Sequence, residues 1–202
     1  FLFPMVVGLF VLRYEVVDVI LRSGEFSSEA AVKTAGVFGV MLIGVIGQSL
    51  LPLFSRAFYA LHNTVIPVVV SVSAVVINLG LNFYLGINLG YGVYGIAVAS
   101  AFSTLLGMIV LMLLLRSKYL NTYAFIPWGH IGIILVSALI MGVSVWFLKQ
   151  MFFDLLSLNV ITKLLALGVS SYLGAILYYL LCRPKVFEES KLLRRLLIGF
   201  TK

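Results

Sequence analysis

Two asparagines and a group of hydroxyl residues are the side chains best suited to chemistry, because they interrupt otherwise apolar segments. Asn78 and Asn82 are four residues apart, so they share one face if their segment is an α-helix. The next apolar segment carries Ser100, Ser103 and Thr104. Together these groups would form an oxygen-rich pocket suited to a hard monovalent cation or a polar substrate group. The alternative is that Asn and Ser simply hydrogen-bond across two packed helices.

The familiar constellations of enzyme active sites are absent from the sequence. His62 and His130 are far apart, and neither has a carboxylate at a spacing typical of a metal site or a general base. Cys182 is the only cysteine, which excludes an internal disulfide and a zinc cluster built from thiolates. Residues 90–92, Gly-Tyr-Gly, are not followed by Lys-Ser/Thr, so they are not a phosphate-binding loop. We therefore expect no enzyme activity, no catalytic residue and no organic cofactor.

The segment that carries the polar residues has the composition of a membrane hairpin. No Asp, Glu, Lys or Arg occurs between residues 57 and 115, and residues 86–90 form a glycine-bounded break. About 20 apolar residues cross the hydrocarbon core, so each half is long enough to span it. In the whole chain 62% of residues are hydrophobic and 10% are charged, whereas soluble proteins have about 25% charged residues. We predict an all-α, polytopic transmembrane protein.

Hydropathy divides the chain into six predicted transmembrane spans. They cover roughly residues 1–21, 33–55, 67–86, 92–115, 131–148 and 160–182. The first is the weakest, because charged residues follow Leu12. Ser27 and Glu29 resemble a helix start, and that helix is expected to continue to Leu61, beyond the thickness of the bilayer. Because Phe1 opens an apolar run without an initiator Met, we expect the chain to be the C-terminal part of a longer polypeptide.

Basic residues near the span ends predict the orientation. Nine lie on one side, against four on the other. The nine are Arg56, Arg116, Lys118, Arg183, Lys185, Lys191, Arg194, Arg195 and Lys202, and the four are Arg22, Lys33, Lys149 and Lys163. This imbalance places the C-terminus in the cytoplasm. The basic tail after Leu181 indicates anionic membrane lipids as neighbours, and no nucleic acid.

Residues 55–67, SRAFYALHNTVIP, resemble the hallmark of the MurJ/MviN lipid II flippases, which belong to the multidrug/oligosaccharidyl-lipid/polysaccharide (MOP) exporter superfamily. In that family an Arg-Ala-Phe-Tyr-Ala run is followed by Asp-Thr and then Pro. Residues 95–100, GIAVAS, are a further match. The residues that agree are Arg56 to Ala60, Thr64 and Pro67, with Pro4, Gly8, Leu9, Leu12, Gly24 and Phe26 in the register of an earlier helix. Asn63 departs from the family, since it stands in place of Asp.

The resemblance implies an architecture and a function. Residues 1–116 would correspond to helices nine to twelve of a fourteen-helix fold, and residues 117–182 to an appended pair, helices thirteen and fourteen. Residues 183–202 would be a basic cytoplasmic tail. The implied activity moves lipid II, the undecaprenyl-diphosphate-linked peptidoglycan precursor, across the bacterial inner membrane by alternating access. The implied partners are lipid II, anionic membrane lipids and the missing N-terminal lobe of the same polypeptide, without which we expect no transport.

The hallmark residues imply a substrate and gate site at the cytoplasmic interface. Arg56, Phe58, Tyr59 and Thr64 would meet the diphosphate headgroup there, with a fixed cation beside amphipathic rings. The alternative is an anchor that sets the depth of the helix and closes the hairpin.

A second implied site binds a cation. Members of the family hold sodium between the helices that match the third and fourth spans, which implies Asn78, Asn82, the carbonyl of Ile96 and Ser100 here. Asn82 stands where a carboxylate can occur, and the loss of that charge weakens the case for sodium. No other metal is expected.

Two other functions are compatible with the sequence. One is another exporter of the same superfamily, for O-antigen or polysaccharide lipids or for drugs by cation antiport. Cavity residues would discriminate, because a lipid-diphosphate carrier needs Arg or Lys there and a drug antiporter needs carboxylates. The other is a non-transporting membrane scaffold that binds partner helices through small-residue faces such as Gly44 and Gly47. A scaffold would tolerate Arg56→Ala.

Overall fold

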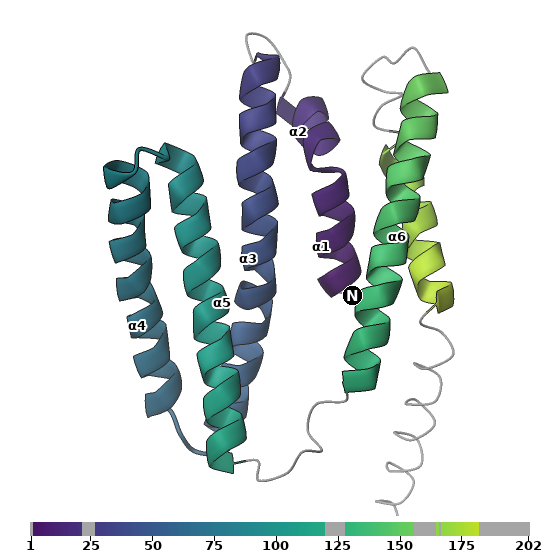
Figure 1. Ribbon diagram of the computed structural model, residues 1–202. Coiled ribbons are helices and arrows are strands. Elements are labelled where there is room, and N and C mark those ends of the chain that lie inside the picture. Colours follow the sequence, from purple (N-terminus) through teal and green to yellow (C-terminus); the bar gives the residue numbers. More distant parts are fainter. Residues whose placement is uncertain (1, 22–26, 120–127, 156–164, 166, 182–202) are drawn as a thin grey trace, which may run out of the picture. The chain divides into compact units, whose positions relative to one another are not determined.

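The computed structural model describes residues 2–21, 27–119, 128–155, 165 and 167–181, and every regular element in these ranges is a helix (Figure 1). The predicted all-α class is therefore confirmed. The elements are α1 (Leu2–Val11), α2 (Arg13–Leu21), α3 (Ser28–Ala60), α4 (Val65–Leu81), the π-helix η1 (Asn82–Asn88), α5 (Gly92–Tyr119), α6 (Trp128–Leu155) and a further helix, Leu167–Leu181.

Four helices are long and apolar enough to cross a membrane, which confirms four of the predicted spans. They are Ser28–Ala60, Val65–Asn88, Gly92–Lys118 and Gly132–Met151. The first predicted span is divided at Leu12 into α1 and α2, and the charged residues Arg13, Glu15 and Asp18 all lie in α2. The last span is described only as Leu167–Leu181, and the rest of it lies outside the described residues.

The helices fall into two compact units. Helices α2 to α5, with η1, form one unit, and α1 groups with α6 and the helix Leu167–Leu181 in the other. The predicted first segment, residues 1–116, therefore contributes helices to both units. Its division from residues 117–182 stays a prediction, and the basic tail, residues 183–202, lies outside the described part of the chain.

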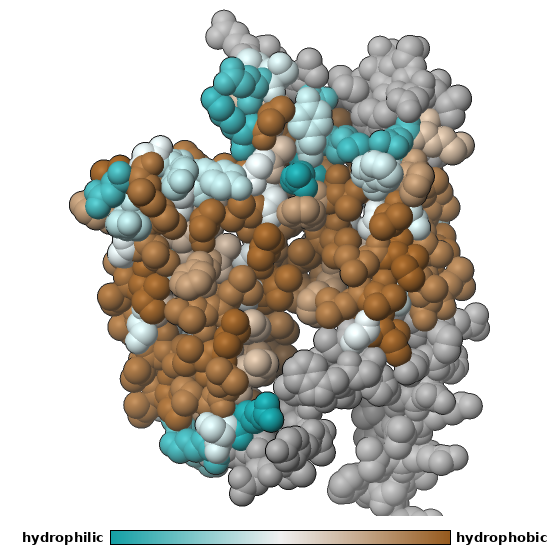
Figure 2. All heavy atoms as spheres, viewed as in Figure 1, coloured by the Kyte–Doolittle hydropathy of each residue, from teal (hydrophilic) through white to brown (hydrophobic). Residues whose placement is uncertain are grey.

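In the larger unit α5 lies between α3 and α4 (Figure 1). Phe58, Val70, Leu111 and Leu115 form the buried core at one end of these three helices. Helix α2 packs on α3, where Val17 meets Ala31 and Ala35. Large apolar side chains remain exposed along α4, and Figure 2 shows them as a continuous apolar surface with hydrophilic residues gathered at its two ends. Such a band is what a lipid bilayer covers.

A π-helix and a tight turn join α4 to α5, at the break predicted for residues 86–90. Gly90 and Gly92 have φ values of 71° and 55°, which L-residues with side chains rarely adopt. The Tyr91 N–H donates to the Leu85 carbonyl at 3.2 Å. A Cβ on Gly95 would lie 2.8 Å from that carbonyl, so only glycine allows the two arms to approach so closely. The break is confirmed, but its π-helical form leaves no signal in the hydropathy pattern.

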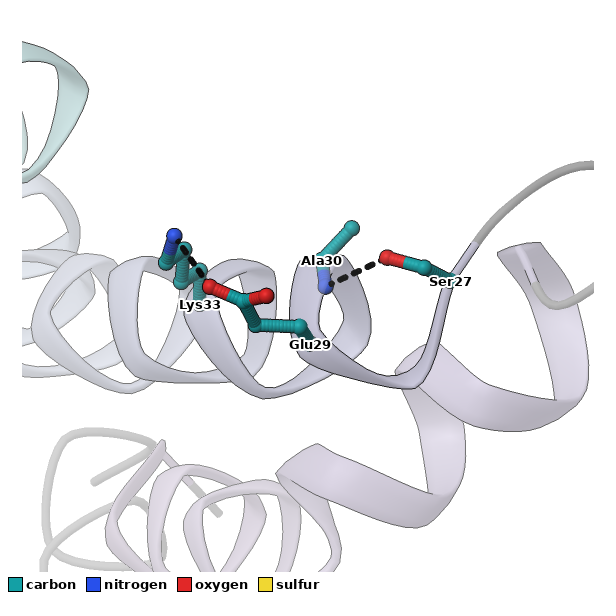
Figure 3. A network of polar contacts seen from close by, with 4 residues as sticks. All are labelled: Ser27, Glu29, Ala30 and Lys33. Carbon is teal, nitrogen blue, oxygen red and sulfur yellow. Dashed lines mark hydrogen bonds and ion pairs between the residues drawn. The ribbon is translucent and has the colours of Figure 1, made fainter.

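The start of α3 confirms the predicted helix signal (Figure 3). The Ala30 N–H donates to the Ser27 hydroxyl at 3.2 Å, which satisfies one of the free amides of the first turn. Lys33 Nζ lies 2.8 Å from Glu29 Oε1, one turn apart on the exposed face. The helix then ends at Ala60, close to the predicted Leu61.

The smaller unit is also held together by small residues. The α carbon of Gly142 on α6 faces α1, since a Cβ there would lie 2.6 Å from Val7 Cγ1. A Cβ on Gly174 would lie 2.6 Å from Val145 Cγ2 and 3.3 Å from Met141 Cγ. Close approach at small residues increases dispersion contacts, which drive helix association where no water is displaced.

Candidate functional site

The hallmark residues lie at the C-terminal end of α3. Arg56 and Tyr59 are exposed and, three residues apart, share one face of the helix. Within the described residues, no carboxylate pairs with Arg56. A helix that ends in an exposed guanidinium beside a phenol presents a cation and an amphipathic ring to a membrane interface. Both side chains are exposed, and their role in a gate stays a prediction.

Phe58 is placed differently from the prediction. Its side chain is fully buried among Val70, Leu111 and Leu115, because it points into the core of the three-helix unit. It cannot offer its ring to a headgroup in this conformation. The structure corrects the predicted direct contact: Phe58 fixes the end of α3 against α4 and α5.

The turn after α3 depends on Asn63, which stands in place of the family's Asp. Its N–H donates to the Phe58 carbonyl at 3.0 Å, and its Oδ1 accepts from the Ile66 N–H at 3.2 Å. One residue thereby closes α3 and caps α4. His62 beside it has a φ of 56°, and exposed Thr64 makes no side-chain capping bond. Asn63 was not among the predicted site residues, although an Asn just before an apolar helix is a recognisable capping signal.

The predicted polar pocket between α4 and α5 is a chain of hydrogen bonds in the structure. Asn82 Nδ2 donates to Asn78 Oδ1 at 2.9 Å, and Asn78 Nδ2 donates to Ser100 Oγ at 3.3 Å. Asn82 belongs to the first turn of η1, so the chain connects all three elements. The structure therefore brings together three of the four predicted ion-site residues.

Two of the predicted hydroxyl residues do not join this chain of hydrogen bonds. Ser103 Oγ donates to the Ala99 carbonyl at 2.8 Å, and Thr104 Oγ1 donates to the Ser100 carbonyl at 2.9 Å. Their protons are used within α5, so only the oxygen lone pairs of these hydroxyls remain to accept a donor or a cation. The Ile96 side chain is exposed, and the side-chain hydrogen bonds of the two asparagines in the described part of the chain run to each other and to Ser100, not to the Ile96 carbonyl.

One acceptor in this cluster remains open. Asn82 Oδ1 is buried and has no hydrogen-bond partner among the described residues. A buried amide oxygen without a donor is unfavourable unless a water or a cation completes it. No group of His, Cys, Asp or Glu that could hold a metal occurs in the described ranges. The donor set is thus neutral and all-oxygen, which suits a weakly held monovalent cation better than a divalent one.

Gln48 on α3 was not singled out from the sequence. It is exposed, as is Ser49 beside it, in the middle of a helix that has the length and hydropathy of a membrane span. Polar side chains at that depth are functional candidates by default. The available signal was an amide within an uncharged, mainly apolar segment, 15 residues after Lys33 and eight before Arg56.

Comparison with known proteins identifies the family. The family model described as "Lipid II flippase MurJ" matches residues 1–167, which is most of the chain. The chain belongs to the lipid II flippase MurJ family. The resemblance that the hallmark motif predicted is therefore confirmed.

Curated relatives agree with this assignment. The chain is 28% identical over 116 residues to a probable lipid II flippase MurJ of Thermotoga maritima, covering 57% of this chain and 24% of the relative. It is 28% identical over 182 residues to a probable lipid II flippase MurJ of Vibrio cholerae serotype O1, covering 86% of this chain and 34% of the relative. The chain thus spans between about a quarter and a third of these relatives.

A solved structure shares the fold. The chain superimposes on a structure titled "Lipid II flippase MurJ, inward closed conformation" with a TM-score of 0.71 and 20% sequence identity. The match covers 92% of this chain and 37% of that one. At this level of identity the match shows the polytopic helical fold alone.

Proposed function

We propose that this chain is part of a lipid II flippase, which moves the undecaprenyl-linked peptidoglycan precursor across the bacterial inner membrane by alternating access. The family match over residues 1–167 carries this proposal. Because the chain spans about a third of its relatives, the remainder of the transport path, including an N-terminal lobe, would come from the rest of the natural polypeptide.

In this proposal the end of α3 is the cytoplasmic gate. Exposed Arg56 would attract the diphosphate, with Tyr59 beside it, and Thr64 would line the adjoining turn. The buried Phe58 ring would hold this end of α3 rigid while the headgroup passes. The orientation follows the excess of basic residues on that side, with the C-terminus also cytoplasmic and near anionic lipids.

The experiment that tests the function is rescue of bacteria depleted of their own lipid II flippase. The natural open reading frame that contains this chain is expected to restore growth and cell shape. Its Arg56→Ala variant is expected to rescue poorly at an equal membrane level, whereas Arg56→Lys retains the charge and part of the activity. Failure of the well-inserted natural polypeptide to rescue would overturn the proposal, and full rescue by Arg56→Ala would remove Arg56 from the gate.

We also propose that Asn78, Asn82 and Ser100 hold sodium at one stage of the transport cycle. Asn82 Oδ1 supports this proposal, because it is a buried, hard oxygen ligand that accepts no hydrogen bond from the described residues. It belongs to the same hydrogen-bonded chain as the side chains of Asn78 and Ser100. A cation coordinated by this oxygen and by Ser100 would tie η1 to α5.

The test of the sodium site is thermal unfolding of the purified natural protein in sodium, potassium or N-methyl-D-glucamine chloride at equal ionic strength. Sodium is expected to raise the midpoint, and Asn82→Asp is expected to raise it further by adding charge. Asn82→Leu should abolish the difference. Equal midpoints in the three salts for the unmodified protein and for Asn82→Asp would exclude the site.

A further inference from the structure

One face of α3 is polar and exposed in the middle of an apolar helix. Gln48, Ser49, Arg56 and Tyr59 are all exposed, and their spacing places them within about a third of the circumference of a helix that turns 100° per residue. We call these four residues the polar stripe. The face that packs on α5 is a different one, since Gly44 and Gly47 lie there against the α5 backbone. The stripe is therefore not part of the described helix contacts.

The stripe extends into the hydrocarbon region. Residues 34–55 separate Lys33 from Arg56 and contain no charged residue. At 1.5 Å per residue they cover about 33 Å, close to the thickness of the bilayer core. Gln48 lies eight residues before Arg56, about 12 Å along the axis and well inside this core. An amide at that depth requires a polar neighbour.

Pro52 adds a further polar group at the level of Gln48 and Ser49, because it leaves a backbone carbonyl without its usual donor. It lies inside α3 and is exposed. Proline has no N–H, so it cannot donate to the carbonyl four residues earlier, which is that of Gln48. The amide side chain, the Ser49 hydroxyl and this backbone carbonyl are thus gathered at one level of the helix. Lipid tails offer no hydrogen bonds to any of them.

The charge of the stripe indicates what covers it. Arg56 is exposed at the interface end and pairs with no carboxylate in the described ranges. A packed protein helix would have to supply both a counterion for Arg56 and hydrogen bonds for Gln48. A phosphate-bearing headgroup supplies oxygen acceptors for Arg56, Tyr59, Ser49 and the Gln48 amide in turn, and it can move from one to the next.

We propose that the polar stripe is a track for a phosphate-bearing lipid headgroup, which leads from Arg56 at the interface to Gln48 in the middle of the membrane. This rests on the proposed flippase function and extends its site from the gate into the bilayer. The lipid tail would remain in hydrocarbon, since the apolar side chains that flank the stripe are exposed to it.

Thiol accessibility tests the track directly in the natural full-length polypeptide with its native cysteines, including Cys182, replaced by serine. Gln48→Cys and Ser49→Cys are expected to react with a charged, membrane-impermeant methanethiosulfonate, and undecaprenyl diphosphate should slow the reaction several-fold. Ile43→Cys is the matched control, because Ile43 is 44% exposed but lies about 140° from Gln48 around the helix. It should stay unreactive. If Gln48→Cys is as inert as the control, or reacts without protection, the track is excluded.

Transport separates this inference from the proposed function. Gln48→Leu is expected to lower rescue of flippase-depleted cells about tenfold at an equal membrane level, whereas Ile43→Leu should leave it unchanged. A single symmetrical peak in size-exclusion chromatography would confirm that both variants are folded. If the unmodified polypeptide does not rescue, the proposed function fails, and protection of Gln48→Cys alone then decides whether the headgroup binds. If it rescues and Gln48→Leu does so equally, only the track is wrong.

Discussion

Gly47 on α3 lies directly against the backbone of Thr104 on α5. A Cβ at position 47 would be 2.8 Å from the carbonyl carbon of Thr104, 2.9 Å from its oxygen and 2.8 Å from the nitrogen of Leu105. Gly44, one turn earlier, would meet the α carbon of Ala101 at 2.9 Å. The two helices therefore touch backbone to backbone, and the polar residues that each carries keep a fixed register.

Gly47→Ala is expected to destabilise the protein by about 1–3 kcal/mol, because neither backbone can move away without disturbing the rest of the contact. Thermal unfolding in detergent measures the effect. The control is Gly80→Ala, since a Cβ at Gly80 meets nothing within 4 Å. An equal effect of the two substitutions would show that α3 and α5 do not approach as described.

The sequence predicted this contact only in part. The small residues Gly44 and Gly47 indicated close helix packing, but not which helix they meet, because glycine carries no information about its partner. Hydropathy located the long spans for a physical reason, since the bilayer sets their length. It could not foresee that the first span is interrupted at Leu12, or that α4 ends in a π-helix. Both depend on tertiary contacts and backbone hydrogen bonds.

Helix spacing predicted which residues of the candidate sites lie together, but not which of them are buried by packing. Asn78, Asn82 and Ser100 were correctly grouped, because a spacing of four residues fixes a shared helix face. Phe58 was expected at the surface, yet a phenylalanine beside Arg56 and Tyr59 points to the opposite side of the helix and into the core. The exposure of Gln48 could be recognised only after the packed face of α3 was known.

Asn63 and Thr64 form a matched pair for testing the turn between α3 and α4. Asn63→Ala should cost about 0.5–2 kcal/mol, because the Ile66 N–H loses its capping acceptor. Asn63→Asp should retain stability, since its carboxylate offers the same acceptor. Thr64→Ala should have little effect on unfolding, as Thr64 makes no side-chain capping bond. Equal losses for Asn63→Ala and Thr64→Ala would contradict this assignment.

The hydrogen bond from Asn78 to Ser100 links α4 to α5 within the membrane and can be measured with a double-mutant cycle. Asn78→Leu, Ser100→Ala and the double variant are expected to give a coupling energy of about 0.6–1.7 kcal/mol. The measurement is the free energy of unfolding from a mild detergent into a denaturing one. Asn78→Leu paired with Ala97→Gly, one turn away on α5, provides a reference cycle that should show weaker coupling. Indistinguishable couplings would mean that the bond makes no net contribution.

Phe58 and Leu53 separate packing from substrate contact at the end of α3. Phe58 is fully buried and Leu53 is 59% exposed on the same helix. Phe58→Ala is expected to lower the free energy of unfolding by about 3–5 kcal/mol, because it leaves a cavity between α3, α4 and α5. Leu53→Ala should change it far less. If Phe58 acts by holding Arg56 in place, Phe58→Leu, which refills most of the cavity, should restore both stability and rescue of flippase-depleted cells. Restored stability without restored rescue would instead indicate that the Phe58 ring contacts the substrate directly.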